Sequence, residues 1–118
     1  MGYRETYDSW KTDPEAYWME QASAIDWVTP PTKALTDHGD NLYEWYADGM
    51  VNGCYNAVDR HVEQGRGDQL AIIYDSPITD KIEKITYSEL KTRVEYLAGA
   101  LLARCVEKGD TVVIYMPM

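Results

Sequence analysis

Residues 70–118 read LAIIYDSPITDKIEKITYSELKTRVEYLAGALLARCVEKGDTVVIYMPM, and this stretch decides the fold class of the chain. Leu70–Tyr74 is an apolar, partly β-branched run that ends at the turn-forming residues 75–77, which predicts a strand. Residues 84–87 predict a second, shorter strand. Thr86 and Glu89 have the spacing of a capping box, which predicts that a helix begins there. Its apolar face recurs at helical spacing: Leu90, Val94, Leu97, Leu101 and Cys105.

The run Thr111–Met116 predicts a third strand, and Pro117 ends it because proline has no amide for a ladder. This strand is apolar at consecutive positions, a pattern typical of strands covered on both faces of an α/β sheet. One helix covers only one face. The sequence therefore predicts an α/β fold of the order strand-strand-helix-strand whose remaining neighbours belong to a larger body.

Composition narrows the class of protein. Apolar residues make up 45% of the 118, and no apolar run approaches the roughly 20 residues of a membrane span. The N-terminus lacks the pattern of a secretory signal, so we expect a cytoplasmic protein with no membrane role. Cys54 and Cys105 stand far apart, which predicts two buried or half-buried thiols rather than a disulfide or a metal site.

The net charge of −9 is uneven, because residues 1–48 hold ten acids against three bases. Such a surface repels phosphate backbones and anionic lipids, which disfavours nucleic-acid and membrane partners. It equally disfavours the first 48 residues as the binding site of a nucleoside triphosphate.

The first part of the chain predicts a helical, aromatic-rich arm. Asp13-Pro14 is a favoured helix start, which predicts a helix over residues 13–24, and residues 26–49 read as an extended meander. All four Trp and six of the ten Tyr lie in the first 55 residues. These rings could stack on sugars or bases, or anchor the arm across a larger body; the acidic charge favours anchoring.

Asn52 predicts the start of a second helix over residues 52–64. His61 beside its apolar face and His38 in a polar loop have no Cys, His or paired carboxylate at ligand spacing, which indicates structural or solvated histidines. We expect the arm to occupy residues 1–68 and the start of a second domain to occupy residues 69–118.

The sequence holds no glycine-rich phosphate loop, nucleophile elbow, metal cluster or carboxylate pair at catalytic spacing. We therefore expect no catalytic, cofactor-binding or metal-ligating residue among these 118.

Several stretches resemble the N-terminus of short-chain acyl-CoA synthetases, the acetyl- and propionyl-CoA ligases of the adenylate-forming superfamily. They follow the family's order along nearly the whole chain: residues 13–18, 25–27, 45–46 with Gly49, Asn52, 55–61, 85–90 and 109–118. Residues 56–60, Asn-Ala-Val-Asp-Arg, and residues 74–77, Tyr-Asp-Ser-Pro, favour the propionyl-CoA branch.

The resemblance implies an intact enzyme in which a carboxylate attacks the α-phosphate of Mg-ATP and coenzyme A then displaces AMP. It implies that the phosphate loop, acyl pocket, coenzyme A contacts and catalytic lysine lie downstream of residue 118. The resemblance therefore assigns no site residue here, and it names the remainder of the synthetase large domain as the partner of this chain.

Cys105 departs from the family, whose helix usually ends at a glycine at this point. A left-handed residue at a helix C-terminus costs glycine nothing and other residues roughly 1 kcal/mol. Either the helix ends elsewhere, near Lys108-Gly109, or this chain tolerates the cost.

Three functional hypotheses follow. The first is an inactive N-terminal fragment of a propionyl-CoA synthetase-like enzyme. The second is a free-standing docking module that associates with a full-length synthetase. The third is an independent α/β domain with an unrelated role.

Overall fold

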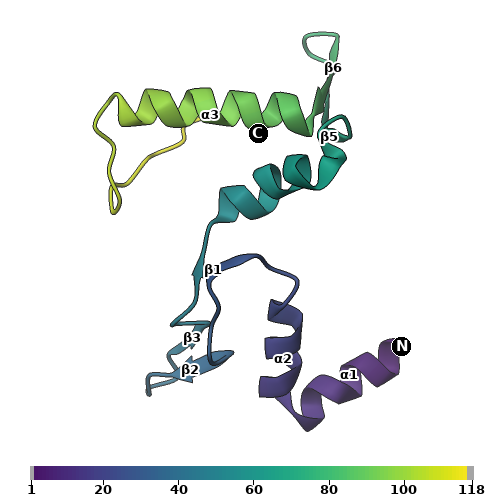
Figure 1. Ribbon diagram of the computed structural model, residues 1–118, viewed down its shortest axis with the longest axis vertical. Helices are drawn as coiled ribbons and strands as arrows, with labels where there is room; N and C mark the ends of the chain where they lie inside the picture. Colours follow the sequence, from purple (N-terminus) through teal and green to yellow (C-terminus); the bar gives the residue numbers. More distant parts are fainter. Residues whose placement is uncertain (1, 117–118) are drawn as a thin grey trace. The chain divides into compact units, whose positions relative to one another are not determined.

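The computed structural model describes residues 2–116, and the chain divides into two compact units at Ala57–Val58 (Figure 1). We call residues 2–57 unit 1 and residues 58–116 unit 2. The fold combines helices with three separate two-stranded antiparallel sheets. The predicted domain boundary between residues 68 and 69 stays a prediction.

Unit 1 begins with two consecutive helices, α1 (Tyr3–Thr12) and α2 (Pro14–Ala22). The predicted helix at 13–24 is confirmed at its start, where the Asp13 side chain accepts a hydrogen bond from the Ala16 amide at 3.0 Å. α1 was not predicted, although its Tyr3, Tyr7 and Trp10 rings recur at helical spacing and contact one another in succession.

Four short strands follow: β1 (Trp27–Thr29), β2 (Leu35–Asp37), β3 (Tyr43–Trp45) and β4 (Met50–Val51). β1 pairs with β4, and β2 pairs with β3. The expected meander at 26–49 is therefore more ordered than predicted. The β2–β3 turn reverses the chain with left-handed residues at Gly39, Asp40 and Asn41, conformations that glycine, aspartate and asparagine tolerate best.

The predicted helix at 52–64 is helical from 53 to 66 and contains two π-helical stretches, η1 (Tyr55–Asp59) and η2 (Val62–Arg66). The Asn52 side chain accepts a hydrogen bond from the Tyr55 amide at 3.0 Å, which confirms the predicted cap.

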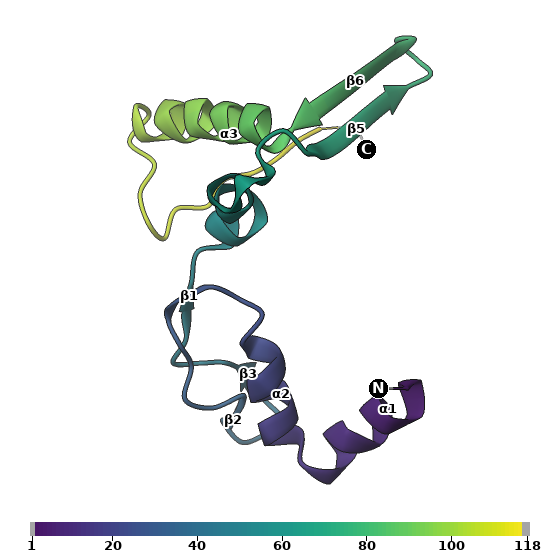
Figure 2. The same ribbon diagram turned by 45° about the vertical axis from the view of Figure 1, so that its right-hand side comes forward.

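Unit 2 continues with a hairpin of β5 (Leu70–Ser76) and β6 (Lys81–Thr86), drawn as two paired arrows in Figure 2. The pairing is antiparallel, with Ile73 opposite Lys84 and Tyr74 opposite Glu83. Both strands are longer than predicted at their turn ends, because the turn is confined to residues 77–80.

The predicted third helix is α3 (Tyr87–Leu102), and its capping box is present. The Thr86 hydroxyl accepts from the Glu89 amide at 3.3 Å, while the Glu89 carboxylate accepts from the Thr86 amide at 2.8 Å. α3 contacts β5, β6 and η2. Its Lys91 pairs with Asp59 at 2.9 Å, and its Arg93 pairs with Glu83 of β6.

The chain leaves α3 at Cys105, which has a left-handed φ of 61°. The Val106 amide bonds to the Leu101 carbonyl at 3.2 Å, and the Cys105 amide bonds to the Leu102 carbonyl at 2.9 Å. This is the Schellman pattern, with Cys105 at the position where glycine is favoured. The alternative of a helix end near Lys108-Gly109 is therefore wrong, and this chain bears the conformational cost.

The predicted strand at Thr111–Met116 is wrong for this structure, in which the segment has no regular secondary structure. A strand exists only when a neighbour supplies the other half of its hydrogen-bond ladder, and none of the strands within residues 2–116 pairs with this segment. The predicted stop at Pro117 lies outside the described residues.

Candidate functional site

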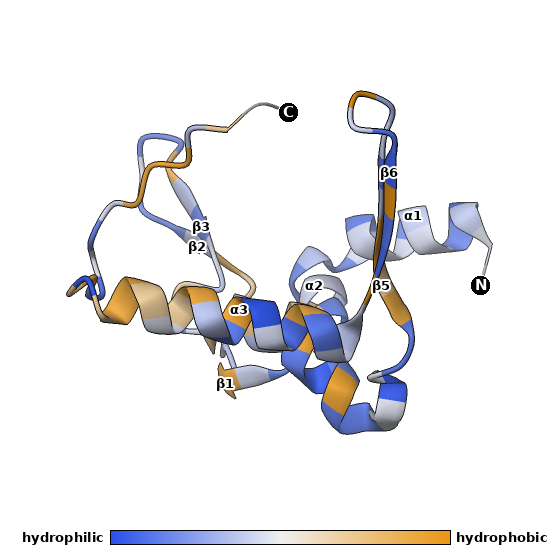
Figure 3. Ribbon diagram, turned by 90° about the horizontal axis from the view of Figure 1, so that it is seen from above, coloured by the Kyte–Doolittle hydropathy of each residue, from blue (hydrophilic) through white to orange (hydrophobic). Residues whose placement is uncertain are grey.

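Apolar side chains of unit 2 are widely exposed. On the hairpin, Ile73 and Ile82 are 63% and 66% exposed, and on α3 Leu97 is 62% exposed although it lies on the predicted apolar face. Residues 112–116 are exposed by 53% to 100% of their surface, and Figure 3 colours much of this run as hydrophobic. Among the described residues, only four hydrophobic ones are buried: Ala22, Ala34, Val58 and Ile85.

These exposed side chains are not confined to one element, because they lie on the hairpin, on α3 and along residues 112–116. Large exposed apolar surfaces are rare on monomeric proteins and mark surfaces that contact other polypeptide. The exposed apolar surface of unit 2 is therefore suited to being covered by other polypeptide.

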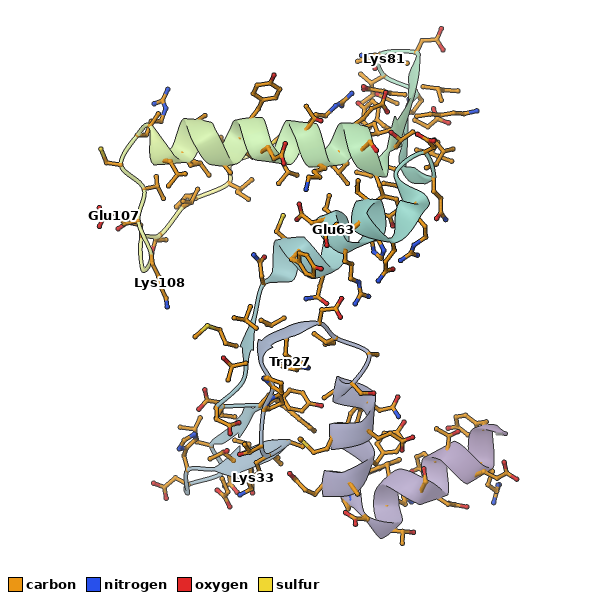
Figure 4. The ribbon with its side chains drawn as sticks, viewed as in Figure 1. Trp27, Lys33, Glu63, Lys81, Glu107 and Lys108 are labelled. Carbon is orange, nitrogen blue, oxygen red and sulfur yellow. The ribbon has the colours of Figure 1, made fainter. Side chains whose placement is uncertain are left out.

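Unit 1 is held together differently, by a chain of aromatic contacts. Ring centroids lie 5.3 Å apart for Trp18 and Trp45, 5.8 Å for Trp45 and Tyr46, and 5.4 Å for Tyr46 and Trp27. The Trp27 indole, labelled in Figure 4, donates to the Ala22 carbonyl at 2.8 Å. The aromatic anchors predicted from sequence thus contact each other within unit 1; their contact with a larger body stays a prediction.

A groove in unit 1 lies beside these rings. It has a volume of about 600 Å³ and is lined chiefly by the side chains of Trp10, Pro14, Trp18, Leu35 and Trp45. Sequence reasoning missed it because α1, which supplies Trp10, was not predicted. The tyrosines and tryptophan at three- and four-residue spacing in residues 3–10 were the available signal.

Polar side chains tie the loops of unit 1 to its other elements. The Asn56 amide accepts from the Asp26 backbone N–H and donates to its carbonyl, both at 2.9 Å. The Asp48 carboxylate accepts from the Thr32 amide at 3.1 and 3.0 Å and from its hydroxyl. These hydrogen bonds, the hydroxyl one first, lower the pKa of Asp48 below its ordinary value.

Both histidines have structural contacts. The His61 ring lies 4.7 Å from the Tyr87 ring and contacts Arg66. Desolvation, and then the charges of Arg66 and Arg60, lower the pKa of His61, which favours neutral imidazole. His38 pairs with Glu44 at 2.9 Å across the β2–β3 hairpin.

Within residues 2–116, no three His, Cys, Asp or Glu side chains gather at metal-binding distance. The expectation of buried thiols is wrong, because Cys54 and Cys105 are both exposed and reduced. Cys54 lies in the first turn of a surface helix, and Cys105 lies in the turn that leaves α3. The expectation of no catalytic or cofactor-binding residue stays a prediction.

No helix among the described residues is both long enough and apolar enough to cross a bilayer.

Two family models divide the chain between them. Residues 3–57 match the acetyl-coenzyme A synthetase N-terminus, and residues 58–118 match the AMP-binding enzymes. The chain belongs to the AMP-binding enzyme family.

Its relatives within that family are short-chain acyl-CoA synthetases. The chain is 49% identical over 116 residues to acyl-CoA synthetase short-chain family member 3, mitochondrial, of Bos taurus, and 48% identical to that of Homo sapiens. It is 46% identical over 119 residues to acetyl-coenzyme A synthetase of Xanthobacter autotrophicus. Each match covers 98% of this chain but only 17% or 18% of the relative. The resemblance inferred from sequence is confirmed.

Two of the residues that carried this resemblance, Gly49 and Asn56, make structural contacts in unit 1. Gly49 lies against the Trp27 ring so closely that an added Cβ would come within 2.7 Å of it. Asn56 joins the start of η1 to Asp26. Gly49 and Asn56 therefore contribute to the packing of this unit.

Proposed function

We propose that this chain is the N-terminal portion of a short-chain acyl-CoA ligase that acts on propionate. The complete enzyme would convert the acid and ATP to an acyl-adenylate and then transfer the acyl group to coenzyme A. The match to short-chain synthetases along 98% of the chain, over 17% of their length, carries this proposal. Residues 56–60 and 74–77 support propionate over acetate by family resemblance.

The chain by itself is expected to be inactive. Binding a triphosphate takes convergent backbone amides and a cation, and the sequence has no phosphate loop to supply them. ATP, Mg²⁺ and coenzyme A would bind to the remainder of the large domain, which is also the proposed partner. We propose the cytoplasm as its location; cell fractionation against the mitochondrially named relatives tests this.

A free-standing docking module is the alternative, and the surface of unit 2 disfavours it. A docking patch in a standard complex buries about 800 Å² on one face of each partner. The exposed apolar side chains of unit 2 occur instead on the hairpin, on α3 and along residues 112–116. That distribution is closer to a domain interior cut open than to a docking patch.

Reconstitution tests the proposal. The Bos taurus relative, produced without the segment that this chain matches, is mixed with the 118-residue chain and assayed for propionate-dependent pyrophosphate release with ATP, Mg²⁺ and coenzyme A. We expect no release from either part alone and release from the mixture. The relative's own missing segment serves as the positive control, and the ratio of propionate to acetate turnover is compared between the two.

Turnover by the 118-residue chain alone would overturn the proposed inactivity. A stable complex between this chain and the full-length relative, with no reconstitution by the truncated one, would favour the docking module instead.

A further inference from the structure

Two dipeptides of unit 1 place a glycine directly after an aspartate or an asparagine: Asp48-Gly49 and Asn52-Gly53. No other Asp or Asn of the sequence precedes a glycine. In such dipeptides the glycine amide nitrogen can add to the side-chain carbonyl carbon and close a succinimide ring, because glycine has no Cβ to obstruct the approach. The structure restrains the two dipeptides differently.

Asp48-Gly49 is held away from this reaction. The Gly49 amide donates to the Tyr46 carbonyl at 2.8 Å, which directs its nitrogen away from the side chain. Hydrogen bonds from the Thr32 hydroxyl and amide lower the pKa of Asp48 and keep its carboxylate ionised. An ionised carboxylate is a poor electrophile, so ring closure is disfavoured at this dipeptide.

Asn52-Gly53 lacks both restraints. The Gly53 amide is the first of the helix that runs from 53 to 66, and the first four amides of a helix have no acceptor within it. Nothing lies within 4 Å of a Cβ added to Gly53, so the backbone has room to turn there. The Asn52 carboxamide is neutral, and its oxygen accepts from the Tyr55 amide at 3.0 Å. A donor at this oxygen stabilises the charge that it acquires when a nitrogen adds to the carbon.

We propose that Asn52 is a site of spontaneous deamidation, in which its side chain reacts with the Gly53 amide. The Gly53 nitrogen forms a bond to Cγ of Asn52, the bond from Cγ to Nδ2 breaks, and the proton of the Gly53 amide leaves on the ammonia. Water then opens the succinimide at either carbonyl and leaves aspartate or isoaspartate in place of Asn52. Ring closure joins neighbouring residues, so it needs no partner chain.

The other two asparagines are weaker candidates. Leucine follows Asn41 and alanine follows Asn56, and in both cases the Cβ of the following residue obstructs ring closure. The Asn56 side chain is also held at both ends, because it accepts from the Asp26 N–H and donates to the Asp26 carbonyl, each at 2.9 Å.

The two products differ in what they do to the helix start. Aspartate keeps a side-chain oxygen at the cap position. Isoaspartate routes the main chain through Cβ and Cγ and turns the Asn52 carbonyl into part of a free carboxylate. That carbonyl accepts from the Asn56 amide at 3.2 Å and from the Asn56 side chain at 3.0 Å. Isoaspartate should therefore loosen the helix start and lower the stability of unit 1.

The test incubates the whole 118-residue chain at mildly alkaline pH beside the variant Gly53→Ala, which keeps the Asn52 cap and has open space for its Cβ. Peptide mass mapping locates each conversion of amide to acid, and enzymatic methylation by an isoaspartyl methyltransferase identifies isoaspartate. We expect conversion at Asn52 in the wild type, faster than at Asn41 or Asn56. Gly53→Ala should convert at least tenfold more slowly.

The proposal is overturned if Asn52 stays intact under conditions in which a free peptide of residues 50–53 deamidates. Equal rates in the wild type and Gly53→Ala overturn it as well. Freshly prepared Asn52→Asp carries the aspartate product, and the isoaspartate fraction of the aged wild type should unfold at lower urea than this variant. Equal urea midpoints would overturn the effect on the helix start. None of these outcomes bears on the reconstitution assay, so the two proposals fail separately.

Discussion

Units 1 and 2 are similar in length but differ in how they are stabilised. Unit 1 joins its short elements through a chain of aromatic rings and through side-chain hydrogen bonds to backbone, such as those of Asn56 and Asp48. Unit 2 has a hairpin, a long helix and an extended segment whose apolar side chains are largely exposed. Unit 1 exposes apolar side chains as well, with Val28 and Leu42 exposed by 65% and 64%. The two units therefore differ in the contacts that join their elements: aromatic rings and side-chain hydrogen bonds in unit 1, and strand pairing and a capped helix in unit 2.

The distribution of tryptophan makes this comparison measurable. All four Trp belong to unit 1, so Trp fluorescence during urea unfolding follows that unit alone. Amide hydrogen exchange of α3 follows unit 2. If the two probes report the same free energy of unfolding, the two units are not stabilised differently and the contrast drawn here is wrong.

The largest effect is expected from Trp27→Ala. It removes a half-buried ring that contacts Tyr46 and donates to the Ala22 carbonyl, and should lower the stability of unit 1 by about 3 kcal/mol. Trp27→Phe keeps an aromatic ring but loses the hydrogen bond. The lost hydrogen bond should lower the stability of unit 1 by roughly 1 kcal/mol, in addition to any cost of repacking the smaller ring. The remaining Trp residues report unfolding; an unchanged urea midpoint in Trp27→Ala would contradict the role of the aromatic chain.

Gly49→Ala should destabilise unit 1 by about 2 kcal/mol, because the new Cβ would lie 2.7 Å from the Trp27 ring and 3.2 Å from the Tyr46 carbonyl oxygen. Gly53→Ala is the matched control, since nothing lies within 4 Å of its added Cβ. Urea unfolding followed by Trp fluorescence measures both. Equal effects of the two substitutions would show that backbone entropy rather than crowding governs Gly49.

Cys105→Gly should stabilise unit 2 by roughly 1 kcal/mol, because glycine adopts the φ of 61° without the steric cost of a Cβ. Exchange of the amides in the last turn of α3 should slow accordingly. Cys105→Ala removes the sulfur but keeps the Cβ, so no comparable gain is expected. A gain from alanine as large as that from glycine would assign the effect to the thiol.

The smallest expected effect is a pH dependence of unit 1. Because hydrogen bonds from Thr32 lower the pKa of Asp48 in the folded chain, its carboxylate stabilises unit 1 above the unfolded value of about 3.9. That stabilisation is lost as pH falls through the lower folded-state pKa. The urea midpoint of unit 1, followed by Trp fluorescence, should therefore fall at acid pH in the wild type. This fall should be smaller in Asp48→Asn.

Glu83→Gln supplies the corresponding control in unit 2. Hydrogen bonding to Arg93, then the charge of Arg93, lowers the pKa of Glu83 in the folded chain. Glu83→Gln should change how the stability of α3, measured by amide hydrogen exchange, depends on pH in the acid range. It should leave the pH dependence of the urea midpoint of unit 1 unchanged.

Local chemistry explains which elements could be predicted. The caps at Asp13, Asn52 and Thr86 each place a side-chain oxygen near an amide three residues later, so the sequence alone locates three helix starts. β1 and β4 could not be predicted, because Trp27 pairs with Val51 across a long loop. α1 and the groove that it helps to line were missed because the N-cap residue of α1, Gly2, has no side chain to signal a helix start.

The residue identities alone were enough to recognise the family and three helix starts, at Asp13, Asn52 and Thr86, because both depend on residue identities at short range or in fixed order. They also determined the amphipathic spacing of α3. The left-handed conformation of Cys105 and the absence of a strand at Thr111–Met116 became clear from the folded chain alone. A strand depends on a neighbour's backbone, and a helix end on the closing hydrogen bonds of the folded chain, so neither follows from the propensities of the residues concerned.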